Sequence, residues 1–95
     1  MLFLIMGKAK AGSTGKERIA RRVRWEYPAG IRLVAEYWAM STDAAVVAVA
    51  EADDVAPILG AIVDWDDVFE LTVIPALTAE QGLQLAKQMQ AGASA

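Results

Sequence analysis

The stretch IRLVAEYWAMSTDAAVVAVA, residues 31–50, decides the fold because it predicts a β-hairpin. Residues 31–40 are expected to form a long strand, with even-numbered and odd-numbered side chains on opposite faces. Ser41, Thr42 and Asp43 form a connection so short that the next strand should pair with the first in antiparallel orientation. That next strand, residues 45–50, is apolar on both faces, which is typical of a central strand covered on both sides.

A strand and a helix are expected before the hairpin. Residues 2–6 are all apolar and predict a buried strand. Thr14 is expected to cap the following helix, because Glu17 lies three residues later and completes a capping-box pattern. The helix should run to about Glu26. Its predicted inward side consists of side chains spaced by four residues, namely Ile19, Val23 and Tyr27.

A second helix is expected after the hairpin. Asp53 or Asp54 should cap it. Apolar side chains then recur at i, i+3, i+4 and i+7, which gives one stripe of Val55, Ile58, Leu59 and Ile62. Residues 65–67 are expected to form the loop by which the chain leaves this helix.

A fourth strand and a further helix complete the predicted elements. Residues 68–77 are predicted as a strand because their odd-numbered positions are wholly apolar. Thr78 and Gln81 form a second capping box and predict a C-terminal helix. Residues 90–95 are expected to be a frayed tail.

This order of elements predicts one α+β domain over residues 1–95, with a β-α-β-β-α-β core and an extra C-terminal helix. It is the order of the ferredoxin-like fold, whose antiparallel sheet is expected to have the strand order 4-1-3-2 and helices on one face. The other face would be a large exposed apolar patch, and such patches mark interfaces. We therefore expect a homodimer or higher oligomer in which a second copy covers this face.

The same order, together with the apolar opening at residues 2–6 and the segment from Trp65 through Phe69 to Pro75, resembles the dimeric α+β barrel superfamily. Within it, the chain is most similar to a small family of unknown function. The resemblance implies a dimer joined through its sheets. The superfamily includes cofactor-free monooxygenases of polyketide quinols, small-molecule isomerases and haem enzymes. Many members use a histidine, and those chemistries do not transfer to a chain that has none.

Composition excludes several classes of site. The chain has no cysteine and no histidine, which removes disulfides, thiol catalysis and the commonest general base and metal ligand. We expect no cofactor and no metal. The acidic segment at residues 64–67 lacks the spacing of a calcium-binding loop. No apolar run reaches the ~18–20 residues that span a membrane, and no export signal is recognisable. A cytoplasmic protein without membrane contact is expected.

A basic face is predicted on the first helix, formed by Arg18, Arg21, Arg22 and Trp25. The pattern fits either a solvated surface or contact with an acidic partner. Nucleic-acid binding is not expected, because the net charge is −3 and the third strand has no aromatic side chain on which a base could stack. The sequence around Lys16 is similar to a phosphate-binding loop, but Lys10 occupies the position of a required glycine.

Polar residues among apolar neighbours on the strands give the candidate site. They occupy even-numbered positions and should project from the sheet face away from the helices: Arg32, Glu36, Glu70 and Thr72. Charges on a covered face must be paired or lie near its rim, so these residues predict either an ion pair that fixes dimer register or a polar patch in a ligand cavity. The side chains predicted to line that cavity are Trp38, Thr72 and Val34. Tyr37 and Phe69 are expected in the core.

Three functions fit these expectations. The first is a binding module that holds an apolar small molecule between sheet faces. The second is a cofactor-independent monooxygenase or isomerase, in which burial raises the pKa of a base, Glu36 or Glu70, and Arg32 stabilises a developing oxyanion. The third is a structural or assembly role, with the dimer as the building block.

Overall fold

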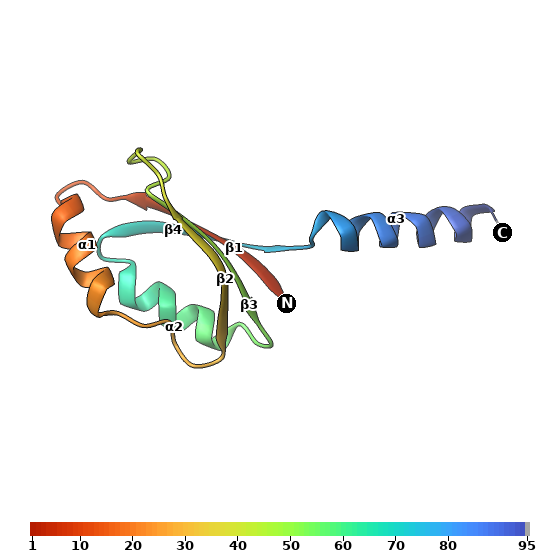
Figure 1. Cartoon of the computed structure of the whole chain (residues 1–95), viewed down its shortest axis with the longest axis horizontal. Coiled ribbons are helices and arrows are strands. Elements are labelled where there is room, and N and C mark those ends of the chain that lie inside the picture. The colour runs from red at the N-terminus through yellow and green to blue at the C-terminus, as the bar shows by residue number, and fades with distance from the viewer. Residues whose placement is uncertain (95) are drawn as a thin grey trace.

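The computed structural model describes residues 1–94, which form a four-stranded sheet and three helices (Figure 1). In chain order the elements are β1 (Leu2–Ala9), α1 (Gly15–Arg24), β2 (Ile31–Trp38), β3 (Val46–Ala52), α2 (Ala56–Trp65), β4 (Phe69–Ala76) and α3 (Ala79–Ser94). All neighbouring strands are antiparallel, and the sheet order is β2-β3-β1-β4. The fold is therefore α+β, and β1 and β3 occupy the central positions that the sequence predicts for the first and third strands.

Helices α1 and α2 lie on one face of the sheet (Figure 1). The central strands direct small or apolar side chains toward them, and Phe3, Ala48, Ala50 and Ala52 are each 2% exposed or less. Alanine side chains let a helix approach the sheet closely, and Ile58 of α2 packs against Phe3 and Ala52. This contact forms one of two core clusters.

The second core cluster lies where α2 leads into β4. It consists of Trp65, Val68 and Phe69, with Trp25 packed against it. Phe69 is buried as predicted. Trp65 differs from the prediction, because it is the last residue of α2 instead of part of an exit loop. Its ring packs edge-on against Trp25, with 5.5 Å between ring centres, and burial of so large a ring favours the longer helix.

The predicted caps of α1 and α3 are confirmed. The Thr14 hydroxyl accepts a hydrogen bond from the Glu17 N–H at 3.1 Å. At α3 the exchange is reciprocal: the Gln81 N–H donates to the Thr78 hydroxyl at 3.0 Å, and the Thr78 N–H donates to the Gln81 side-chain oxygen at 2.9 Å. Before α2, the Asp54 carboxylate accepts from the first N–H of the helix at 3.0 Å. Local sequence therefore determines where these helices begin.

An irregularity in β2 reverses the predicted direction of its second half. The register shifts between Leu33 and Ala35, and a bulge of this kind moves every later side chain to the other face. Glu36 and Trp38 consequently lie opposite helix-facing residues of β3 and project toward the helices, so the prediction that they face away is wrong. Tyr37, predicted in the core, lies instead on the open face and is 65% exposed.

Helix α1 is also turned differently from the prediction. Val23, expected on its inward side, is 78% exposed. The arginines expected on an outer basic face instead lie over aromatic rings: Arg18 over Phe69, Arg21 over Trp65, and Arg22 over Trp25 and Tyr27. Guanidinium groups are attracted to ring faces, and their long apolar stems can be buried while the charge remains near water. These contacts outweigh burial of the Val23 side chain.

Helix α3 extends away from the end of the sheet (Figure 1). Its apolar side chains Leu83, Leu85 and Met89 are 62%, 46% and 67% exposed. The helix continues to Ser94, so the frayed tail predicted from residue 90 is wrong through residue 94, and residue 95 lies outside the described residues. None of the helices in residues 1–94 combines the length and apolar character needed to cross a membrane.

The sheet face opposite α1 and α2 is open (Figure 1). We refer to it as the open face. Register places Met6, Val47 and Tyr37 side by side across three of its strands. Ile74 on β4 adds a further exposed apolar side chain. The apolar surface expected from the sequence is therefore present on the side of the sheet without helices.

Candidate functional site

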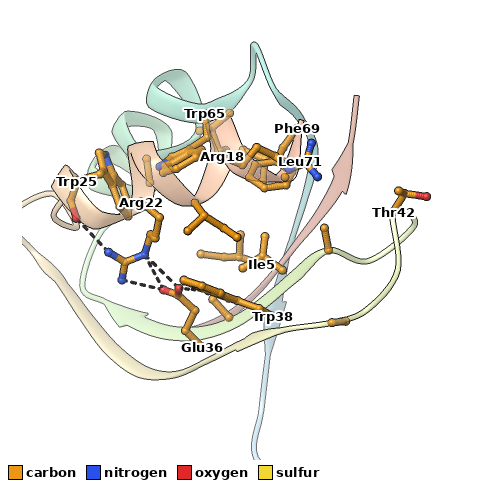
Figure 2. Close-up of a pocket in the computed structure, with 18 of the residues that line it drawn as sticks. Ile5, Arg18, Arg22, Trp25, Glu36, Trp38, Thr42, Trp65, Phe69 and Leu71 are labelled. Carbon is orange, nitrogen blue, oxygen red and sulfur yellow. Dashed lines mark hydrogen bonds and ion pairs between the residues drawn. The ribbon is translucent and has the colours of Figure 1, made fainter. Parts of the chain in front are cut away.

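A cavity of about 440 Å³ lies between the two helices and the sheet (Figure 2). Its size falls in the range of pockets that hold small organic molecules. Most of its wall is apolar or aromatic, with contributions from Ile5, Ile58, Ile62, Trp65, Phe69 and Leu71. All three tryptophans of the chain contribute to the lining. The cavity is on the opposite side of the sheet from the position predicted for a ligand.

Glu36 forms the polar corner of this cavity. Its carboxylate accepts hydrogen bonds from Arg22 Nη2 at 3.0 Å and Arg22 Nε at 3.1 Å (Figure 2). The Tyr27 hydroxyl donates to it at 2.5 Å, and the Trp38 indole N–H donates at 2.7 Å. The Glu36 side chain is only 11% exposed. We call these four residues the Glu36 cluster.

The cluster holds Glu36 in its charged form. Burial opposes ionisation of the carboxyl group, but the hydrogen bonds from Arg22, Tyr27 and Trp38 outweigh it and keep the pKa of Glu36 below its ordinary value. Burial, reinforced by the hydrogen bond to Glu36, raises the pKa of Tyr27. At neutral pH the corner therefore contains an ion pair and a neutral phenol. The pKa shift of Glu36 is opposite to the one that a general base would need.

We expect the protein to lose stability as the pH falls below about 4.5, the ordinary pKa of a glutamate side chain. Because the pKa of Glu36 is lower in the folded state, the unfolded state binds more protons in this range. The stabilisation by Glu36 is complete above that pH and is lost as the pH falls through the folded-state pKa. Urea unfolding between about pH 3 and pH 7 measures this slope. Glu36→Gln should flatten it, and a variant profile parallel to wild type would contradict the assignment.

Acidic residues at the C-terminal end of α2 and just after it hold α1 in place. Asp67 accepts two parallel hydrogen bonds from Arg21, at 2.7 and 2.8 Å. Asp64 accepts from the Trp25 indole N–H at 2.9 Å. The two carboxylates remain exposed while they make these contacts. Within residues 1–94, no group of three or more acidic side chains is placed to bind a metal ion.

A family model described as a domain of unknown function (DUF3303) matches residues 1–90. The chain belongs to this family. No curated protein and no solved structure was found to match it. The matched range of the DUF3303 domain contains the whole sheet, α1, α2 and every residue of the Glu36 cluster.

In the structure of this DUF3303 domain, the polar residues that the sequence predicts in one site lie apart. Arg32 is exposed near the start of β2, where its Nη2 lies 3.5 Å from Oε2 of Glu51. Glu70 lies on β4, opposite Lys8. Strands β2 and β4 are the two edges of the sheet, and three strand spacings of roughly 4.8 Å separate them. Arg32 and Glu70 therefore cannot form the predicted common site with Glu36.

Of the side chains predicted to line a ligand site, only Trp38 reaches the cavity. Thr72 is exposed on β4, where it lies opposite Met6 on the open face. Val34 lies within the bulge of β2 and is 57% exposed. Neither side chain lines the cavity of the DUF3303 domain.

Sequence reasoning missed Arg22 and Tyr27 as members of a site. The spacing predicts Arg22 on a basic face and Tyr27 on the inward side of the first helix. One signal was available: three consecutive apolar residues, 33–35, interrupt the polar–apolar alternation of β2 between Arg32 and Glu36. Such an interruption is where a strand accommodates a bulge, and the bulge brings Glu36 to the helix side of the sheet.

Proposed function

We propose that this DUF3303 domain is a binding module whose cavity holds an apolar or aromatic small molecule. The observation that carries the proposal is the cavity of about 440 Å³, whose aromatic and aliphatic wall ends in a polar corner already neutralised by its own ion pair. A site of this kind binds by excluding water from apolar surface, with few polar groups to orient the ligand.

Catalysis by the predicted bases has less support. Glu36 is occupied by three donor side chains, and its lowered pKa makes it a weak proton acceptor. Glu70 and Arg32 lie at opposite edges of the sheet and do not line the cavity. Binding is therefore the function that the geometry favours over a cofactor-independent oxygenase or isomerase.

Binding can be tested by tryptophan fluorescence, because Trp25, Trp38 and Trp65 all line the cavity. The probe 8-bromo-1-octanol carries a heavy atom that quenches tryptophan on contact. We expect saturable quenching by wild type. Ala45→Phe places a large ring on the lining, in space that the probe would occupy. Because a loss of ~1.4 kcal/mol of binding free energy corresponds to a tenfold weaker affinity, we expect binding to weaken at least about tenfold.

Val63→Phe is the matched control, because Val63 is 62% exposed on α2 and is not part of the lining. It should bind the probe like wild type. Thermal unfolding must show that both variants are folded. Quenching that rises linearly without saturation, or equal binding by Ala45→Phe, would overturn the binding proposal.

We further propose that the domain has the ferredoxin-like arrangement and that two copies pair through their open faces, as in the dimeric α+β barrel superfamily that the sequence resembles. The exposed apolar side chains Tyr37 and Ile74 on that face support this second proposal. So does α3, whose exposed Leu85 and Met89 belong to a helix that would be marginally stable alone in water. In a twofold pair each copy contributes the same face and the same helix, so one interface can cover both the open face and the apolar side chains of α3.

A further inference from the structure

Arg18 is a cation on the wall of the cavity. It projects from α1, and its guanidinium lies 5.7 Å from the centre of the Phe69 ring. One N–H donates to the Ser13 hydroxyl at 2.7 Å. Arg18 and Glu36 lie at different ends of the cavity in the view of Figure 2. The two polar features of the cavity are therefore distinct.

Arg18 differs from the other arginines that contact the core. Arg21 pairs with Asp67 at 2.7 Å, and Arg22 pairs with Glu36 at 3.0 Å. Among the ion pairs of residues 1–94, none includes Arg18. A guanidinium has five N–H donors, and the Ser13 hydroxyl accepts from only one of the Arg18 nitrogens. Arg18 therefore lines the cavity with N–H donors to spare.

The charges of the lining do not balance. Its ionised side chains are Arg18, Arg22 and Glu36. Glu36 already neutralises Arg22 and is surrounded by donors, so it has little capacity to serve Arg18 as well. A half-buried cation beside apolar walls is best paired with an anion that carries an apolar group. Such a ligand neutralises the charge and also covers the apolar walls.

We propose that the cavity binds a carboxylate whose apolar body fills the space beside Trp65 and Phe69 while Arg18 binds the head group. This inference rests on the proposed binding function and specifies its ligand class. The planar guanidinium can donate two parallel N–H bonds to a carboxylate, and a neutral alcohol of the same length cannot receive both. Hydrogen bonds between two charged groups are roughly twice as strong as neutral ones, so a preference of at least about tenfold is expected.

The experiment compares 8-bromooctanoate with 8-bromo-1-octanol by tryptophan quenching at neutral pH. The two probes share the chain and the quenching atom and differ only in the head group. Wild type should bind the carboxylate at least about tenfold more tightly. Arg18→Gln should bind the two probes within about twofold of each other, because it retains a polar side chain but loses the charge. Arg18→Lys should recover part of the preference.

Arg24→Gln is the matched control, since Arg24 belongs to the same helix and lies outside the lining. It should keep the preference of wild type. If wild type binds both probes equally, or if Arg18→Gln keeps the preference, the inference about Arg18 is overturned while the binding function stands. If neither probe quenches saturably, the binding function itself fails.

Discussion

Replacing Glu36 with glutamine is expected to lower the free energy of unfolding by about 2–3 kcal/mol. The carboxylate is the common acceptor for Arg22, Tyr27 and Trp38, and its side chain is 11% exposed. Glutamine keeps one acceptor oxygen but removes the charge that pairs with Arg22. A domain of this size has a total stability of roughly 5–14 kcal/mol, so the loss is a large fraction. Urea unfolding at neutral pH measures it.

Glu70→Gln is the matched control, because it makes the same chemical change on another strand of the same sheet. Glu70 is exposed and outside the cavity, so its substitution should change the free energy of unfolding by no more than about 0.5 kcal/mol. Equal losses in the two variants would show that the Glu36 cluster does not stabilise the fold.

The contribution of the Arg22–Glu36 pair can be separated with a double-mutant cycle. Arg22→Gln and Glu36→Gln each remove one partner of the ion pair. Their effects should not add, and the coupling energy should be about 1–2 kcal/mol, because the second substitution removes an interaction that the first has already broken. Additive losses would instead assign the cost of Glu36→Gln to Tyr27 and Trp38.

The sequence predicts the order of the elements well because local signals specify it. The capping residues Thr14 and Thr78 act on the N–H groups of the next turn, and both helices begin where these pairs indicate. The small apolar residues 45–50 indicate a central strand, and β3 is central, although helices cover only one of its two faces. Such signals depend on neighbours in the sequence and need no knowledge of tertiary contacts.

The candidate site could not be predicted in the same way, because it depends on one irregular backbone step. Strict alternation puts Glu36 on the same face as Arg32, whereas the register shift between residues 33 and 35 puts them on opposite faces. The orientation of α1 has a similar cause. Helical spacing identifies a basic stripe and an apolar stripe, but only the aromatic rings of Trp65 and Phe69 make the basic stripe the better partner for the core.

A lysine at position 47 should convert a dimer into a monomer. Val47 lies on the central strand β3, between Met6 and Tyr37 on the open face. In a twofold pair each substitution occurs twice, so two ammonium groups would be placed in one apolar interface. Removing one ammonium group from water without a partner costs at least about 1.5 kcal/mol. The two groups together therefore weaken association more than about hundredfold. Sedimentation at about ten micromolar should show dimeric wild type and monomeric Val47→Lys.

Two further variants make this result specific to the open face. Val63→Lys introduces the same charge on α2, where the side chain is 62% exposed, and should remain dimeric. Tyr37→Lys changes a side chain that is 65% exposed in the single chain, so it should disrupt the dimer without unfolding the domain. Monomeric wild type would contradict the proposed dimer. A Val47→Lys protein that stays dimeric would place the interface elsewhere. Loss of the dimer on truncation after residue 78 would then assign that interface to α3, whose apolar side chains are otherwise left in water.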